Sequence, residues 1–414
     1  MSLRLFFVHI PKTAGTTFNA FLDQQFYLAQ IAPREVFDKY ELRMQRNDFQ
    51  EYLNELKQFS LFRGHYGYEI FKDFIDEYIT LTILRDPFKR VISLYNDWRS
   101  KSEEHLKHTR DSEKSLALLA KQLSFQEFFQ AEHPLIPLFF HNGQARQLAY
   151  SLVSDFEEDK LQDLALHNLN KIDYVGTTEA FDLFRWILCE QFGWHYTPQL
   201  QVLNAARGYL RLEDLDDATL ATIADKNRVD LALYGRAKER ALETANRVMQ
   251  APPLPKTYLD FRNQSHITIT MAHPIPGTGW HARAGSSDRL WRWTGPNLET
   301  TLFLRLDPRR YMLVIRVIFV THINILHQSK ISINSTPIPI AIDKSSGDFF
   351  IKGTIPAALL NSASLTRLAI TVPQNMASTD INPTANDARQ RGLAIQEIVL
   401  ATAEPTQAEP TLEL

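Results

Sequence analysis

The hydrophobic pattern of the first half of the chain alternates short apolar runs with longer amphipathic stretches. Residues 3–10 are almost wholly apolar and predict a buried strand, and a turn at 11–15 leads into a helix expected over about 16–26. Residues 78–84 predict a second strand, which a turn connects to a helix reaching about 99. A strand, a turn and a helix, repeated in this way, indicate a parallel sheet covered by helices. Helical patterns at 181–192 and 217–249 complete this domain.

The second half has a different texture, with short runs of period-two or wholly apolar character separated by Gly, Pro, Asn and Asp. These runs lie at 265–271, 300–306, 311–325, 331–334 and 365–372, and they predict an antiparallel sandwich or jelly roll. The proline cluster at 251–255 stops the preceding helix and stiffens the chain. We therefore expect an α/β domain over 1–250, a Pro-rich linker over 251–262, an all-β module over 263–402 and a flexible acidic tail over 403–414.

Composition narrows the class of protein. The 414 residues include 45 basic and 48 acidic side chains, a net charge of −3, with 44% hydrophobic residues. That balance is typical of a soluble two-domain protein, and it does not indicate nucleic-acid binding. The single cysteine, Cys189, cannot form an internal disulfide or a thiolate metal site, and we expect it in the core. With no signal peptide and no run of roughly 18 apolar residues, the sequence predicts a cytoplasmic protein without a membrane span.

The segment after the first predicted strand has the layout of a phosphate-binding loop. Its sequence, "HIPKTAGTT" at 9–17, combines a strand end, a turn of small residues and a helix start, where backbone N–H groups and the helix dipole favour an anion. Lys12 adds a mobile positive charge. The loop departs from the nucleoside-triphosphate pattern G-x-x-x-x-G-K-[ST], because Lys12 precedes the only glycine, Gly15. Taken alone, such a turn also occurs as an ordinary connection between a strand and a helix.

A second turn makes the phosphate interpretation stronger. The segment "RDPFKRVISLY" at 85–95 also starts at a strand end, with Asp86 as the expected N-cap and Pro87 in the first helical position. The forked guanidinium of Arg85 and the hydroxyl of Ser93 suit a second phosphate. Two anion sites at the carboxyl edge of one parallel sheet predict a ligand that is phosphorylated at two places.

The ordered pair "PKTAGTT" and "RDPFKRVISLY" resembles the 5′-phosphosulfate loop and the 3′-phosphate motif of sulfotransferases that use 3′-phosphoadenosine 5′-phosphosulfate (PAPS). The branch that it is similar to is that of the heparan sulfate 2-O-sulfotransferases. The likeness extends to "GHYGYEIF" at 64–71, "NGQARQLAY" at 142–150 and "YVGTTEAFDLFRWILCEQFGW" at 174–194. It covers roughly residues 1–250 and leaves the β module unassigned.

The resemblance implies a role for each matching position. Lys12 would contact the 5′-phosphosulfate and stabilise the leaving group, and Arg85 and Ser93 would bind the 3′-phosphate. His65 would be the general base, since it stands in the Gly-His motif of the family. The 5′-phosphate would be held by the amides and hydroxyls of Thr13, Gly15, Thr16 and Thr17.

Two further positions carry alternatives. The family often has a second histidine two residues before the base, and here that position is Arg63, which weakens a two-histidine mechanism. Arg146 matches an arginine often found in the family, with acceptor or cofactor contact as one interpretation and a surface salt bridge as the other.

The implied activity is the transfer of a sulfuryl group from PAPS to a hydroxyl of a carbohydrate, such as a precursor of a bacterial surface polysaccharide, without a metal. One alternative is an ATP-dependent phosphotransferase, and another is a nucleotide-binding or glycan-binding protein that has lost catalysis. His9 is expected to be structural, and the spacing of His105 and His108 fits a metal pair poorly.

Tryptophans cluster at 280–293 in the β module. They suggest sugar stacking, but burial in one end of the core is favoured. Three roles of the module stay open, namely acceptor orientation, partner docking and homo-oligomerisation.

Overall fold

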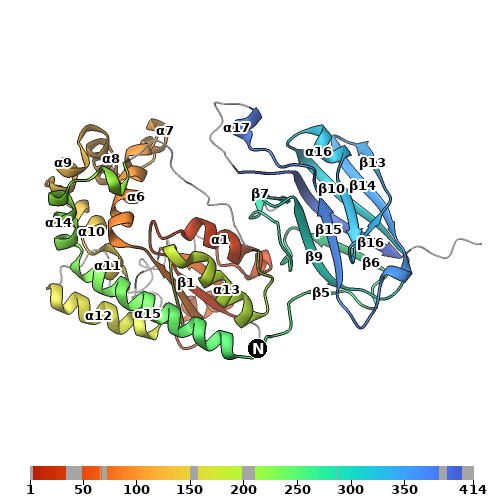
Figure 1. Ribbon diagram of the computed structural model, residues 1–414, viewed down its shortest axis with the longest axis horizontal. Coiled ribbons are helices and arrows are strands. Elements are labelled where there is room, and N and C mark those ends of the chain that lie inside the picture. The colour runs from red at the N-terminus through yellow and green to blue at the C-terminus, as the bar shows by residue number, and fades with distance from the viewer. Residues whose placement is uncertain are drawn as a thin grey trace, which may run out of the picture. The chain divides into compact units, whose positions relative to one another are not determined.

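The computed structural model describes residues 3–33, 49–65, 67, 72–149, 157–197, 210–286, 288–381 and 389–402. The chain divides into two compact units (Figure 1). Unit 1 comprises Met1–Asn19, Gln30–Ile187 and Asn204–Pro252, and unit 2 comprises Ala20–Ala29, Leu188–Leu203 and Pro253–Leu414. The tail predicted over 403–414 lies outside the described residues. None of the described helices is long and apolar enough to cross a membrane.

Unit 1 is built on a four-stranded sheet in which every strand pair is parallel. The order is β2–β1–β3–β4, with bounds β1 (Leu5–Val8), β2 (Leu61–Gly64), β3 (Ile79–Leu84) and β4 (Tyr174–Thr177). Val8 at the end of β1 pairs with Gly64 on one side and with Thr82 on the other. The carboxyl ends of β2, β1 and β3 therefore lie next to one another at one edge of the sheet.

Two hydrophobic clusters join many of the helices of unit 1. One hydrophobic cluster joins the sheet to α4, α11, α12 and α15, and a second joins α6, α8, α9, α10 and α14. Helices α12 and α15 run side by side (Figure 1). The bounds are α1 (Gly15–Asp23), α4 (Phe49–Leu56), α6 (Pro87–Ser100), α7 (Glu103–Lys107), α8 (Asp111–Gln122), α9 (Phe125–Gln130), α10 (Leu135–Phe140), α11 (Gly143–Ala149), α12 (Glu158–Lys171), α13 (Phe181–Phe192), α14 (Asp217–Lys226) and α15 (Arg228–Gln250).

The sequence predicts β1, β3, α1, α6 and α13, and one further prediction in unit 1 is wrong. The single helix expected over 217–249 is two helices, α14 and α15, which meet at Asn227. Asn227 leaves the helical conformation, with φ −127° and ψ 28°. Its side-chain Nδ2 donates to the carbonyl of Ile223, while its Oδ1 accepts from the N–H of Asn142. The break follows from these side-chain bonds, which helical periodicity does not reveal.

Unit 2 contains two β-sheets. The first has the order β13–β14–β10–β16–β8–β7 with β6 paired to β16, and the second has the order β12–β11–β15–β9–β5. All pairs are antiparallel except β5 with β9. The bounds are β5 (Leu259–Asp260), β6 (His266–Thr270), β7 (Ala284–Ser286), β8 (Arg289–Trp293), β9 (Glu299–Arg305), β10 (Tyr311–Val320), β11 (Lys330–Ile333), β12 (Thr336–Ile338), β13 (Ile340–Ser345), β14 (Asp348–Ile355), β15 (Thr366–Thr371) and β16 (Leu393–Thr402). Both sheets contribute to one hydrophobic cluster, as the alternating pattern predicts.

Two sequence expectations for unit 2 need correction. The strand expected over 311–325 ends with β10 at Val320, because a short helix, α16 (Ile323–His327), follows it with His322 as its N-cap. The tryptophan cluster is only partly buried. Trp280 is 2% exposed and its Nε1 donates to the carbonyl of Thr301 at 2.8 Å, whereas Trp291 and Trp293 are half-buried.

Buried charge holds part of unit 2 together. The carboxylate of Asp23 lies 3.0 Å from Arg283 Nη1 and 2.9 Å from Arg292 Nη2. The side chains of all three residues are at most 6% exposed, so this cluster of two cations and one anion is shielded from water.

Cys189 is fully buried, which confirms its predicted place in a core.

Candidate active site

The residues singled out in the sequence gather at the carboxyl edge of the sheet of unit 1. His65 follows β2, the loop at 11–15 follows β1, and Arg85 follows β3. Because β1 lies between β2 and β3, the loop has one of these residues on each side. Ligands bind to open parallel sheets at such an edge, where the strand order reverses.

The backbone of the loop has an unusual conformation. Lys12 and Ala14 have positive φ angles of 70° and 63°, and Thr13 between them does not. This alternation turns successive N–H groups toward a common concavity that favours anions. A non-glycine residue with positive φ is uncommon, and such positions concentrate at functional sites. At Gly15, where α1 begins, a Cβ atom would lie 1.6 Å from His9 Nε2, so only glycine fits there.

Side chains from α6 and from Arg85, the residue after β3, hold this loop in place. Arg85 Nη1 donates to the carbonyl of Lys12 at 3.0 Å, and Arg90 Nε donates to the carbonyl of Pro11 at 3.2 Å. The Lys12 ammonium pairs with Asp97 at 2.8 Å. The hydroxyl of Thr13 is fully buried and donates to the carbonyl of Ile10. Arg90 and Asp97 contact the loop directly, yet neither was singled out in the sequence.

The hydroxyl-bearing residues of the loop differ in exposure. Thr16 is exposed and Thr17 is buried. Since the Thr13 hydroxyl is bonded within the loop, the backbone amide is the group that Thr13 can offer to a ligand.

Arg85 retains an unused donor. Its Nε is buried and has no hydrogen-bond partner among the residues that the structure describes. Burial lowers the pKa of Arg85, and the nearby carboxylates of Glu179 and Asp86 oppose that effect. Gln144 of α11 fixes the backbone here, since its side chain accepts from the Arg85 N–H and donates to the Arg85 carbonyl, both at 2.9 Å. A buried, unsatisfied guanidinium donor suits an anionic ligand.

Ser93 lies on the loop side of α6. It is half-buried, and it stands three residues after Arg90 and four before Asp97, so all three share one helix face. Since Arg90 and Asp97 both contact the loop, Ser93 faces the same region.

The tautomer of His65 follows from its hydrogen bond. His65 Nδ1 lies 2.8 Å from the carbonyl oxygen of His9, which can only accept. Nδ1 must therefore carry a proton, and in the neutral form of the ring the lone pair is on Nε2. Gln147 donates to the same carbonyl at 3.0 Å. The His65 side chain is exposed, and a neutral imidazole is suited to accept a proton from a substrate.

His9 lies against His65, with ring centroids 4.1 Å apart. Burial, followed by the nearby His65 and Lys12, lowers the pKa of His9 to about 3. The His9 ring is therefore neutral near pH 7. The sequence contained a signal for this pair, because each histidine directly follows a strand. The pairing of β1 with β2, which would have joined them, was not predicted.

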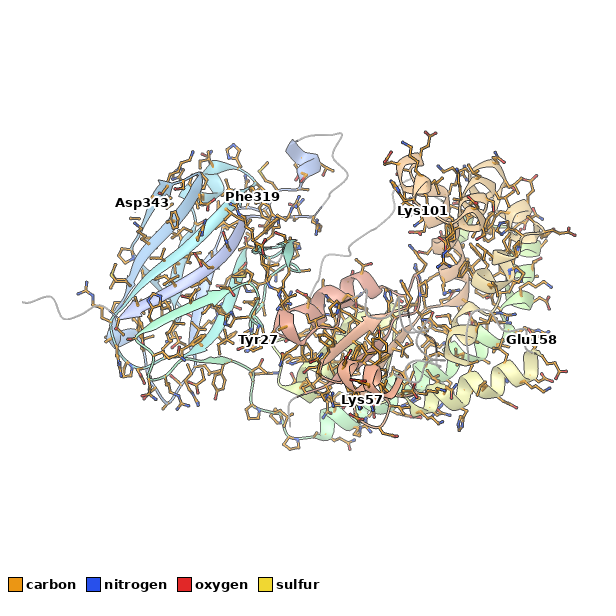
Figure 2. The ribbon with its side chains drawn as sticks, turned by 180° about the vertical axis from the view of Figure 1, so that it is seen from behind. Tyr27, Lys57, Lys101, Glu158, Phe319 and Asp343 are labelled. Atoms are coloured by element: carbon orange, nitrogen blue, oxygen red, sulfur yellow. The ribbon has the colours of Figure 1, made fainter. Side chains whose placement is uncertain are left out.

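Arg146 lies in a different place. Its Nε donates to the carbonyl of His141, and its side chain lines a pocket with His141, Glu158, Lys226 and Arg228. Glu158, at the start of α12, is labelled in Figure 2. This pocket shares no residue with the loop at 11–15.

No metal-binding group appears in the part of the chain that the structure describes, since no three His, Cys, Asp or Glu side chains gather there. His105 and His108 are both exposed.

Comparison with known proteins gives one family match. Residues 2–201 match the model of a family described as "Sulfotransferase family". No curated protein matches the chain. Among solved structures, a GH26-CBM35 β-(1,4)-mannanase of Podospora anserina is 14% identical with a TM-score of 0.23, covering 34% of this chain and 29% of the mannanase. The GH115 4-O-methyl-α-glucuronidase BtGH115A, specific for decorated arabinogalactans, is 9% identical with a TM-score of 0.24, covering 73% of this chain and 34% of that enzyme.

The chain thus spans about a third of the length of either glycoside hydrolase, and at these TM-scores neither likeness bears on its activity. The family match supports a sulfotransferase over residues 2–201, with sulfuryl transfer as the general chemistry of this part of the chain.

Proposed function

We propose that this protein transfers the sulfuryl group of PAPS to a hydroxyl of a carbohydrate acceptor, in a manner similar to the heparan sulfate 2-O-sulfotransferases. The family match supports sulfuryl transfer, and the two motifs at 11–17 and 85–95 support PAPS as the donor. The carbohydrate acceptor rests on the resemblance of those motifs to that branch.

The chain offers suitable groups for both ends of the donor. The loop at 11–15 would act as a P-loop-like cradle for the 5′-phosphosulfate, through its converging N–H groups, the first turn of α1 and Lys12. Arg85 would bind the 3′-phosphate through its unused Nε, together with the Ser93 hydroxyl. When bound, PAPS supplies a sulfuryl group whose bond to the 5′-phosphate oxygen breaks while the acceptor oxygen bonds to sulfur.

The side chains of the site would assist both ends of that transfer. His65 Nε2 would take the proton of the acceptor hydroxyl, which is a poor nucleophile while protonated. Lys12 and the loop amides would stabilise the negative charge that develops on the departing 5′-phosphate. His9, neutral near pH 7, leaves the neighbouring imidazole of His65 without a cation stacked against it.

One contact carries the proposal. Arg85, the candidate for the 3′-phosphate, donates directly to the carbonyl of Lys12, the candidate for the 5′-phosphosulfate. Two segments that each suit an anion are thus bonded to one another, which favours a single ligand with two phosphorylated positions over a nucleoside triphosphate.

Calorimetric titration with adenosine 3′,5′-bisphosphate tests the donor. We expect the wild type to bind it, and Arg85→Ala to weaken binding about 10- to 100-fold, as the loss of a charge-assisted contact does. Arg236→Ala, which removes an arginine that pairs with Glu239 and Glu243 on α15, should bind like the wild type. Binding of ATP with magnesium but not of the bisphosphate would overturn the proposal in favour of a phosphotransferase.

Transfer assays with PAPS and a set of oligosaccharides test the base. His65→Ala should lower kcat about 10²- to 10⁴-fold and leave bisphosphate affinity unchanged, since His65 would act on the acceptor.

A further inference from the structure

One face of α6 lies along the loop at 11–15. Arg90, Ser93 and Asp97 share this face, because they are three, four and seven residues apart. Arg90 holds the carbonyl of Pro11 and Asp97 holds the ammonium of Lys12. The carboxylate of Asp97 is therefore a negative charge inside a site whose other groups suit an anion.

Lys12 is restrained at both ends. Its carbonyl accepts from Arg85 at 3.0 Å and its Nζ donates to Asp97 Oδ1 at 2.8 Å. The side chains of Lys12 and Asp97 are 25% and 37% exposed. The second oxygen of Asp97 lies 3.4 Å from the Nζ of Lys101, which follows α6 and is labelled in Figure 2. One carboxylate thus pairs with two ammonium groups beside the loop, which leaves a net charge of +1 on the three side chains.

Asp97 is ionised near neutral pH. Partial burial raises its pKa, but the contacts with Lys12 and Lys101 outweigh burial, and the pKa ends below its usual value. An anionic ligand that enters the loop would therefore be repelled by the Asp97 carboxylate, and it would find Lys12 already paired with that carboxylate.

We propose that Asp97 is an internal counter-anion, which occupies Lys12 when the loop is empty and must release or share it when an anionic ligand binds. Asp97 thereby weakens the hold of the site on negatively charged ligands, including the bisphosphate product. This inference rests on the proposed function for the identity of that product, since a phosphate at the loop is what displaces the carboxylate. Asp97 is a positioning residue, because it acts through Lys12.

The replacement Asp97→Asn tests this with little change of shape. Calorimetry with adenosine 3′,5′-bisphosphate should show binding about 10-fold tighter than in the wild type, because a like charge beside the ligand is removed. Asp97→Ser should act in the same direction. Glu157→Gln, which removes one negative charge from an exposed pair with Lys160, is the matched control and should leave affinity unchanged. Thermal unfolding of each variant verifies that it folds.

A double-mutant cycle separates this role from a structural one. In a Lys12→Ala background, Asp97→Asn should tighten binding clearly less than in the wild type, because the ion pair is already absent. Equal or weaker binding by Asp97→Asn in a folded protein would overturn the inference.

Inorganic pyrophosphate distinguishes the two proposals. If Asp97→Asn binds pyrophosphate more tightly and neither protein binds the bisphosphate, the counter-anion role stands and the PAPS proposal fails. If both proteins bind the bisphosphate equally, the donor proposal stands and the counter-anion role fails.

Discussion

A single residue, His9, makes the stability of unit 1 depend on pH. Its ring is 8% exposed and lies between Gly15 and His65. A charge on this ring would be costly, because burial, His65 and Lys12 all oppose it. The unfolded chain takes up a proton at His9 near pH 6.5, whereas the folded chain does so only near pH 3.

The stabilisation due to neutral His9 is fully present above pH 6.5 and is lost as the pH falls toward 3, because the unfolded state then binds the additional proton. Between pH 7 and pH 5 the wild type should lose about 2 kcal/mol of unfolding free energy from this residue. Urea denaturation at both pH values measures the loss. His9→Asn should lose correspondingly less, and an equal loss in both proteins would show that His9 does not titrate in this way.

At the scale of elements, α11 and α15 cap one another. Asn142, the residue before α11, accepts at Oδ1 from the N–H groups of Val229 and Asp230 in the first turn of α15. Asp230 in turn accepts from the N–H groups of Gln144 and Ala145 in the first turn of α11. Gln144 then fixes the backbone of Arg85. The position of Arg85 therefore depends on a capping arrangement that begins 57 residues away, as counted from Asn142 in the sequence.

Removing this cap should be more costly than removing an ordinary one. Asn142→Ala loses both cap bonds and places alanine at a φ of 51°, so we expect about 2–3 kcal/mol of lost unfolding free energy. Asn142→Gly removes the same hydrogen bonds without strain at the positive φ, so its loss of unfolding free energy measures the contribution of the hydrogen bonds alone. Asp216→Ala removes the exposed N-cap of α14 and should lower the unfolding free energy less than Asn142→Ala does. Urea denaturation measures both losses. Equal losses of unfolding free energy for Asn142→Ala and Asp216→Ala would show that mutual capping of α11 and α15 contributes no more stability than an ordinary cap.

The elements that the sequence predicted well are those with a local signal. The strand and helix around 78–99 carry an apolar run, the N-cap Asp86 and Pro87, and the structure confirms all three. The sequence did not predict the break at Asn227, so the single helix expected there is wrong. It also did not predict the cap at Asn142 or the contact of Asp97 with Lys12. Each of these features depends on a partner far along the chain. Hydrophobic periodicity contains no information about such partners. The distinction between a sandwich and a jelly roll stays a prediction.

For the whole molecule, the division into units does not follow the order of the chain. Unit 2 includes Ala20–Ala29 and Leu188–Leu203, both from the half of the sequence that predicted an α/β domain. Asp23 in the first of these segments pairs with both Arg283 and Arg292. The predicted domain boundaries, 1–250 and 263–402 with a linker between them, stay a prediction.

Asp23→Ala should therefore destabilise unit 2 strongly, because it removes a carboxylate that lies within 3.0 Å of two buried guanidinium groups. We expect a loss of about 3–5 kcal/mol, measured by chemical unfolding followed through tryptophan fluorescence. Asp343→Ala is a useful comparison, since Asp343 (Figure 2) pairs with Lys352 on the exposed surface of β13 and should cost about 0–1 kcal/mol. Similar losses in the two variants would contradict the importance of the buried cluster.

The separation of Asp23 from its arginine partners also has a consequence for synthesis. Asp23 and Arg283 are 260 positions apart, and a ribosome adding about 5–20 residues per second needs about 10–50 s to cover that distance. During this interval the loop at 11–15 and the residues of α1 have been synthesised, but the arginine partners of Asp23, at the end of α1, have not. Unit 2 is completed later still, because β16, at Leu393–Thr402, pairs with β10, β6 and β8.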